Sequence, residues 1–466
     1  MAASLPQELI DAIVDYIWDD KPTLGCCVAV CRAFRARSRS LLFSSIVLSN
    51  AATCRRLYDD ILTAFPDVAS LVRRLEIVDP IPKDPRHHLD DTWIASSERL
   101  PATIQLLSPH LRHISLTSEG YHYQNHDFTH VFHWRKATAE LKCALLGAFS
   151  SKDMVSIELS GIVINSCQGL FDLLAGSPVK SLALPLFWHA IPECVIRPPV
   201  SPPHTRPQPH SLSVRLSDCL INYMLSPYVA IDVCDVRDLT LKVPGNFSPE
   251  IRPAATKLFL TVGNNIEKLV VEENIYFGDI PEVFQLTHCQ NLKVVQFITT
   301  VYTMDNSYWT YLSRMLETIA PDNHMEQVLI KADLYSTGNS GNVSEWLDWG
   351  DLDEVLTQPR MSYLKSVRIE LSIWGQVNDH VDDWSDATEE INSHTSISAK
   401  SCVGLMYHGI FNFFFQQYDI YVLHVRLIFG LTSQPKSARL RLYLLPQYFR
   451  GSKLENKIDR DWRDRR

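Results

Sequence analysis

A short apolar pattern recurs along this chain and constrains its fold more than any other feature. Each copy has an apolar residue, two variable positions, a second apolar residue, one variable position and a third apolar residue. The alternation in the second half of the pattern is typical of a β-strand. The middle apolar residues of the copies are Ile46, Leu75, Ile114, Ile157, Leu182, Leu212 (a weaker copy that begins at Pro209), Leu239, Leu269, Val295, Val328 and Val367.

Successive copies begin 25 to 43 residues apart, and several are separated by runs typical of helices, at 51–65, 138–149, 217–225 and 308–319. A strand followed by a helix has one apolar side that it cannot cover alone, so neighbouring units are expected to stack and to align their strands in one curved parallel sheet. This spacing resembles that of leucine-rich repeats. The sequence therefore predicts an α/β chain, with an irregular leucine-rich-repeat-like solenoid over residues 49–375.

An ordinary doubly wound α/β domain also alternates strands and helices, and it remains the alternative fold. Such a domain would be expected to carry a glycine-rich phosphate turn or a cluster of polar groups at its strand ends. The sequence has neither. It also lacks the GxSxG, GxxxxGK[ST], HExxH and GxGxxG strings of common enzyme and nucleotide sites, so we expect no catalytic residues and no cofactor.

The first 48 residues form a separate, helical pattern. Ser4, Pro6 and Glu8 mark a helix start, and apolar residues follow at steps of three and four up to Ile17. A second helix is expected from Thr23, its cap, to Val30, and a third over 32–42. A unit of about forty residues is too small to bury a core that is stable by itself. We therefore expect a partner to cover its remaining apolar surface. The alternative is a plain helical cap on the domain that follows.

The order of apolar residues here, with Leu5-Pro6, Leu9-Ile10, the Val30-Cys31-Arg32 step and Leu42-Phe43, resembles an F-box of the fungal type. Phe34 stands where that family usually has tryptophan. The resemblance implies docking onto a Skp-type adaptor of a cullin-RING (SCF) ubiquitin ligase, with the rest of the chain selecting a protein substrate and catalysing nothing itself. The residues expected to divide between the helical core and the adaptor surface are Leu5, Pro6, Leu9, Ile10, Ile13, Leu24, Val28, Val30, Phe34 and Phe43. A repeat scaffold that binds protein independently of any ligase is the alternative function.

The variable positions beside each middle apolar residue should face away from the helices, on the concave side of the sheet. Their charges are mixed. Val270 and Leu329 are apolar where solvent is expected, which favours a protein or peptide partner, although cover by helices or loops would explain them equally well. The expected substrate-binding residues are Asp238, Thr240, Lys268, Val270, Gln296, Gln327, Leu329 and Arg368.

Three segments interrupt the pattern. Residues 198–209 are rich in proline and predict an extended loop, with a PxxP ligand as a second reading. Residues 376–400 carry many acidic side chains and predict a linker or loop. The segment 401–466, whose apolar stretch at 403–431 is broken by polar residues, has no clear structure and does not resemble a membrane span.

Cysteine usage and charge bound the environment and the partners. The 11 cysteines are unpaired in spacing, with no CxxC unit, and no leader-like segment opens the sequence. We therefore expect a reducing compartment, the cytoplasm or the nucleus. A formal net charge of −9 gives no general attraction to nucleic acid or anionic lipid, although a local basic patch is compatible with it.

Four histidines between His122 and His133 have helical spacing, but no clear helix stripe supports a metal site there, and a polar loop is the simpler interpretation.

Overall fold

The computed structural model describes residues 5–80, 92–118, 132–164, 173–184, 187–188, 206–226, 231–243, 251–275, 285–301, 307–336, 350–376 and 420–430. The chain divides into two compact units. The first comprises Met1–Thr299, Ser307–Met325 and Trp349–Tyr363, and the second comprises Thr300–Asn306, Glu326–Asp348 and Leu364–Arg466.

The first unit begins with three short helices, as the sequence predicted. They are α1 (Gln7–Tyr16), α2 (Lys21–Val30) and α3 (Arg32–Ser44). The prediction that Thr23 caps the second helix is wrong, because Asp20 is the cap. The Asp20 carboxylate accepts the Thr23 backbone N–H at 3.1 Å and the Thr23 hydroxyl at 2.6 Å, so α2 begins two residues earlier and has proline in its first turn. Ser4 lies outside the described residues.

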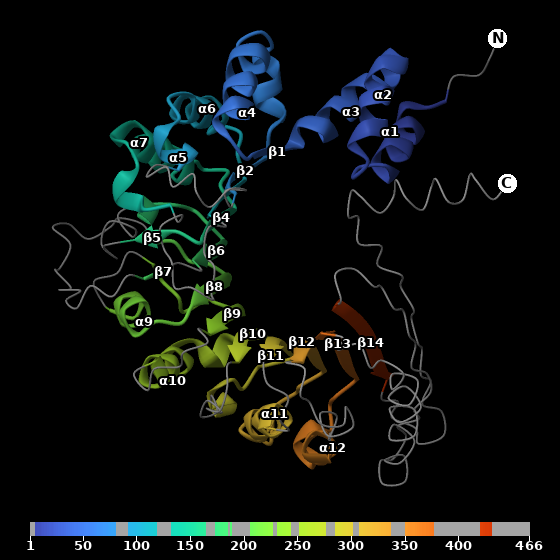
Figure 1. Ribbon diagram of the computed structural model, residues 1–466, viewed down its shortest axis with the longest axis vertical. Helices are drawn as coiled ribbons and strands as arrows, with labels where there is room; N and C mark the ends of the chain where they lie inside the picture. The colour runs from blue at the N-terminus through green and yellow to red at the C-terminus, as the bar shows by residue number, and fades with distance from the viewer. Residues whose placement is uncertain are drawn as a thin grey trace. The chain divides into compact units, whose positions relative to one another are not determined.

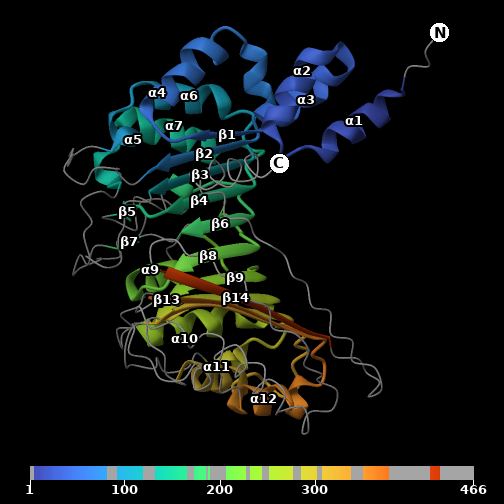
Figure 2. The ribbon, with the colours of Figure 1, turned by 45° about the vertical axis from the view of Figure 1, so that its right-hand side comes forward.

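A sheet follows, with its strands in the order of the sequence. Every neighbouring pair from β1 to β10 runs parallel, and Figure 2 shows the strands following one another from β1 to β9. The strands of this sheet in the first unit are β1 (Ser45–Leu48), β2 (Arg74–Asp79), β3 (His113–Ser118), β4 (Ser156–Ser160), β6 (Ser181–Leu184), β8 (Ser211–Arg215), β9 (Asp238–Val243), β10 (Lys268–Ile275) and β11 (Val294–Val301), the last of which ends just past the unit boundary.

The middle apolar residue of the repeated pattern sets the register of this sheet. Ile46 lies opposite Leu75, Leu75 opposite Ile114, and the same match continues strand by strand to Leu269. Because a slip of one residue would turn the apolar side chains toward solvent, burial of one face specifies this register. The predicted strand positions are therefore confirmed, including the weaker copy at Leu212.

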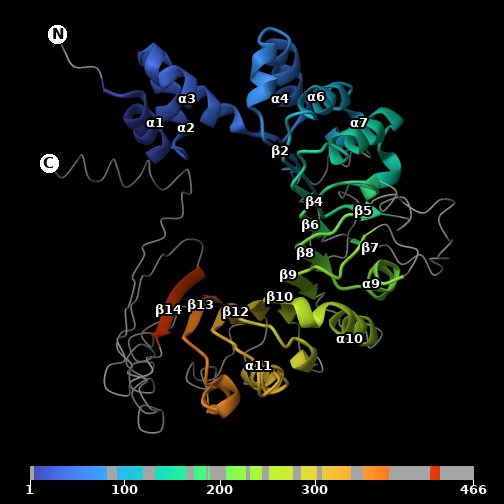
Figure 3. The same cartoon turned by 180° about the vertical axis from the view of Figure 1, so that it is seen from behind.

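The helices that follow α3 lie along one side of the strands (Figures 1 and 3). A doubly wound sheet would reverse its strand order and carry helices on both faces, and this unit does neither. The chain is thus α/β with a parallel sheet that has the order expected of stacked strand and helix units. The helices after α3 in this unit are α4 (Ala51–Arg56), α5 (Trp93–Ser96), α6 (Arg99–Leu107), α7 (Ala139–Phe149), α9 (Asp218–Met224), α10 (Ile251–Val262), α11 (Ser307–Glu317) and α12 (Gly350–Leu356).

Short turns of other kinds complete the unit. A π-helical turn, η1 (Leu57–Leu62), continues α4. The 3-10 turns are η2 (Pro66–Leu71), η3 (Trp134–Lys136), η4 (Gly263–Asn265), η5 (Leu286–His288) and η7 (Pro359–Met361), and β5 (Val163–Ile164) pairs with β7 (Phe187–Trp188) in a separate parallel ribbon.

The core lies between the sheet and these helices. Strand residues alternate between buried and half-exposed, as in β3 and β4, and the buried ones meet apolar helix residues such as Ile104, Phe149 and Phe259, which are at most 1% exposed. Each such side chain contributes about 1.5–3 kcal/mol through burial. This leaves the other face of the sheet to carry the polar positions.

Three further strands lie in the described residues of the second unit. β12 (Gln327–Ser336) and β13 (Ser366–Gln376) run parallel, and Val328 lies opposite Val367 as the repeated pattern predicts. β14 (Ile420–Gly430) pairs antiparallel with β13 and lies in the segment whose sequence predicted no structure.

Several sequence predictions fall outside the described residues. They are the acidic linker 376–400 apart from Gln376, most of 198–209, and the histidines at 122, 126 and 130. Among the described helices, none is long and apolar enough to cross a membrane.

Candidate docking site

Helix α1 is apolar on two faces, and the three-helix unit covers only one of them. Ile10 and Val14 point into the unit, where they are buried together with Leu24 of α2. Leu9 and Ile13 lie on the other face and remain 52% and 50% exposed. Tyr16, three residues after Ile13, continues this stripe of the helix, and the exposed Leu5 lies just before the helix begins. We name Leu5, Leu9, Ile13 and Tyr16 the α1 face.

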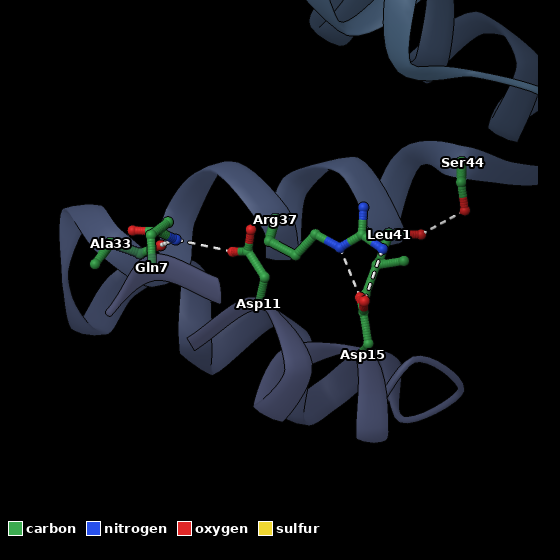
Figure 4. Close-up of polar contacts among 7 residues, drawn as sticks. All are labelled: Gln7, Asp11, Asp15, Ala33, Arg37, Leu41 and Ser44. Carbon is green, nitrogen blue, oxygen red and sulfur yellow. Dashed lines mark hydrogen bonds and ion pairs between the residues drawn. The ribbon is translucent and has the colours of Figure 1, made fainter. Parts of the chain in front are cut away.

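Polar contacts fix α1 against α3 (Figure 4). The guanidinium of Arg37 donates to both carboxylate oxygens of Asp15, at 2.6 and 2.9 Å. The Gln7 amide donates to Asp11 at 2.8 Å and to the carbonyl oxygen of Ala33 at 3.0 Å. The hydrogen bond to Asp15 raises the pKa of Arg37. These contacts orient α1 without covering the α1 face.

The residues predicted to serve the helical core and the adaptor surface differ in exposure. The exposed residues are Leu5, Pro6, Leu9, Ile13 and Val30. The buried residues are Ile10 and Leu24, and the half-buried residues are Val28, Phe34 and Phe43.

Two exposed aromatic residues at the end of α1 were missed by the sequence analysis. Tyr16 is 87% exposed and Trp18 is 66% exposed. Large exposed aromatic side chains are typical of interface anchors. Extending the stripe Leu5, Leu9, Ile13 by a further three residues would have found Tyr16, because position 16 falls on the same face of the helix.

The three-helix unit continues directly into the sheet. Helix α3 ends at Ser44 and β1 begins at Ser45. The Ser44 carbonyl accepts the Arg73 backbone N–H at 2.9 Å, and Arg39 of α3 contacts Asp67 of η2 at 3.0 Å. No linker separates the helices from the first strand.

The predicted substrate-binding residues fall in both units. In the first unit, Asp238 pairs in register with Lys268 and Thr240 with Val270, and Gln296 lies on β11. Val270 is only 8% exposed, so it offers little contact surface.

The other three predicted positions belong to the second unit. Leu329 pairs in register with Arg368, and Gln327 with Ser366. The guanidinium of Arg368 also forms an ion pair with Glu370 on its own strand.

The structure also contains a buried carboxyl group that the sequence gave no reason to single out. The Tyr311 hydroxyl donates to Glu273 Oε1 at 2.6 Å, and both side chains are enclosed between β10 and α11. Burial raises the pKa of Glu273 to about 7, although the hydrogen bond from Tyr311 opposes this shift. Asp79, at the same position of the repeat on β2, also has its pKa raised to about 7 by burial. Both carboxyl groups are shielded from solvent, Asp79 being 6% and Glu273 7% exposed.

No group of three or more histidine, cysteine, aspartate or glutamate side chains in the described parts of the chain could hold a metal ion. No known family model matches the chain, and no curated protein matches it. The described residues present two outward surfaces, the exposed α1 face and the half-exposed face of the sheet.

Proposed function

We propose that this chain is a substrate-recognition adaptor of an SCF-type (cullin-RING) ubiquitin ligase. The N-terminal helices are the F-box that binds a Skp-type adaptor. The strand and helix units are divergent leucine-rich repeats that hold a protein substrate. Ubiquitin transfer itself is carried out by partner subunits, so the chain contributes no catalytic residue.

The observation that carries this proposal is the α1 face. Leu9, Ile13 and Tyr16 are each at least half exposed although they lie on one stripe of one helix. A contiguous apolar patch of this kind is typical of an interaction surface. Burial of three or four such side chains contributes about 1.5–3 kcal/mol each before the costs of association, which suffices for a stable complex.

The arrangement of the sheet supports the second half of the proposal. Parallel strands in sequence order, with helices along one side, are what stacked repeats require. A sheet of this kind leaves one face open along several strands, and such faces bind extended partners.

The test is co-expression of the full chain with a Skp-type adaptor, followed by affinity capture. We expect a soluble one-to-one complex with the native chain and none with Leu9→Glu/Ile13→Glu, because two carboxylates would then need to be buried unpaired at the interface. The matched control is Leu146→Glu/Leu260→Glu, which changes two exposed leucines of α7 and α10 by the same chemistry and should leave capture unchanged.

A milder variant guards against loss of folding. Leu5→Ala/Pro6→Ala removes apolar contacts at the start of α1 without adding charge, and should also abolish capture while circular dichroism stays native. Equal capture of the native chain and both variants would exclude docking through α1. If the native chain does not bind the adaptor, a repeat scaffold that acts independently of any ligase would be favoured instead.

A further inference from the structure

The starts of successive strands align in a row at the amino edge of the sheet in the first unit. The carbonyl oxygen of Arg73 accepts the backbone N–H of Arg112 at 2.8 Å, that of Arg112 accepts Val155 at 2.7 Å, and that of Val155 accepts Lys180 at 2.9 Å. The His210 N–H continues the row on the Lys180 carbonyl at 2.8 Å. Side chains far apart in the sequence are thereby placed one strand apart, about 4.8 Å from each other.

Cations stand in or beside this row at the starts of β2, β3 and β6, with Val155 between them at β4. We name Arg73, Arg74, Arg112 and Lys180 the cationic edge; Arg74, Arg112 and Lys180 are exposed. Arg74 contacts Glu76 at 2.7 Å, whereas Arg112 and Lys180 have no ion-pair partner among the described residues. Asp153 is the acidic residue of the turn before β4. The edge therefore carries uncompensated positive charge on a chain whose formal net charge is −9.

The imidazole of His113 lies among these cations. His113 lies opposite Arg74 in the sheet. Burial lowers the pKa of His113, and the charges of Arg74 and Arg112 lower it further. A cluster of cations that disfavours one more positive charge favours a bound anion.

Beside the cationic edge, the first outward position of β4, β6 and β8 is a serine, and the next outward position of β4 is Glu158. Ser156, Ser181 and Ser211 lie opposite one another on β4, β6 and β8, and all three are half-buried. Their small side chains let a backbone approach closely, and their hydroxyls can donate or accept hydrogen bonds. These are the properties needed to hold a peptide backbone.

The row changes character at β9. Arg237 precedes that strand and Glu267 precedes β10, and Glu267 contacts Arg237 at 3.8 Å and Lys293 at 2.7 Å, so the cations there have an acidic partner within the chain. Four strand spacings from β2 to β8 cover about 19 Å, which an extended peptide spans with about six residues. A single-stranded nucleic acid needs exposed aromatic rings on which its bases stack, and the named edge and hydroxyl positions do not supply them.

We propose that the cationic edge and the serine row beside it bind a short acidic peptide segment of a partner protein. The carboxylates lie along Arg74, Arg112 and Lys180, and the backbone lies over the serines. The identification of this segment as part of a ligase substrate rests on the proposed function. The binding of an acidic peptide to the cationic edge does not depend on that function.

The test measures binding of a fluorescein-labelled peptide of alternating Glu and Ser to the full chain by fluorescence anisotropy. We expect saturable binding that weakens as salt is raised, and no binding of the matching Gln and Ser peptide. Arg112→Glu/Lys180→Glu should weaken binding by about tenfold or more. The control Lys257→Glu/Arg314→Glu makes the same change of charge on exposed positions of α10 and α11 and should bind as the native chain does.

If circular dichroism shows that the variant Arg112→Glu/Lys180→Glu does not fold, the variant Arg112→Gln/Lys180→Gln replaces it, and we expect a smaller loss of affinity for the peptide. Equal binding by native chain and variant, or tighter binding of an oligothymidylate of equal charge, overturns the proposal. Capture of the Skp-type adaptor by Arg112→Glu/Lys180→Glu should be unchanged, so failure here is separable from failure of the docking role.

Discussion

Glu273 shows how a single side chain couples the stability of the repeats to pH. Its carboxyl group is buried and hydrogen-bonded to Tyr311, and burial raises its pKa from 4.5 to about 7. The folded chain therefore holds the carboxyl group protonated under conditions where the unfolded chain ionises it. Stability from this group is fully present below pH 4.5 and is lost as the pH rises toward 7.

We expect Glu273→Gln to remove much of this pH dependence. Glutamine keeps an acceptor for the Tyr311 hydroxyl and cannot ionise, so the variant should gain on the order of a few kcal/mol over the native chain at pH 8 and little at pH 4.5. Urea unfolding at the two pH values measures the difference. Glu158→Gln, on the half-exposed face of β4, is the control. Burial also raises the pKa of Asp79 to about 7, so both carboxyl groups should make the native chain less stable at pH 8 than at pH 4.5. Equal stability of the native chain at the two pH values would contradict this prediction.

Sequence analysis at this scale succeeded for residues whose role is periodic. The burial of the middle apolar residues could be predicted because the same position faces the helices in every copy of the pattern. Glu273 and Tyr311 could not, because they are 38 residues apart and only the helix-on-sheet packing brings them together. Arg112 and Lys180 were missed for the same reason. Each occupies a variable position of its own repeat, and their alignment exists only once the strands pair.

At the scale of elements, the end of β4 shows how a glycine terminates a strand. Gly161 follows β4 with a φ of 65°, and a Cβ there would overlap the carbonyl oxygen of Ser118 at the end of β3. Glycine is thus required both by its conformation and by the approach of the neighbouring strand.

Gly161→Ala should therefore destabilise the chain by about 1–3 kcal/mol or more. Gly147→Ala is the matched control, because a Cβ at this exposed position of α7 meets nothing within 4 Å, and alanine should stabilise the helix by up to about 1 kcal/mol. Opposite shifts in the thermal midpoint are expected. A neutral or stabilising effect of Gly161→Ala would show that β3 and β4 do not approach as described.

The elements near the N-terminus were predicted well because helix starts and apolar stripes are local signals. The start of α2 differs because Asp20 competes with Thr23 for the cap position and lies ahead of a proline, which is tolerated in the first helical turn. The placement of β14 beside β13 could not be predicted, since the two strands are separated by more than forty residues without the repeated pattern.

At the scale of the whole molecule, the junction between helices and sheet determines where the chain can be divided. β1 pairs with β2 from Ser45 to Leu48. A truncation that removes residues 1–44 keeps this edge strand, whereas removal of 1–48 leaves the longer strand β2 with unpaired backbone groups.

We expect the chain lacking residues 1–44 to stay soluble, to lose capture of the Skp-type adaptor and to keep binding of the acidic peptide. The chain lacking 1–48 should aggregate more readily, because an exposed strand edge templates pairing between molecules. Light scattering and the two binding assays measure these outcomes. Retained adaptor capture without α1 to α3 would place the docking surface elsewhere.

Because α3 passes into β1 between consecutive residues, Ser44 and Ser45, no spacer residues separate the helices from the first strand. Under the proposed function, the adaptor bound at α1 and the substrate bound over the strands are therefore joined by the shortest connection that the chain allows. Such a connection would restrict which lysines of the substrate a partner subunit can reach.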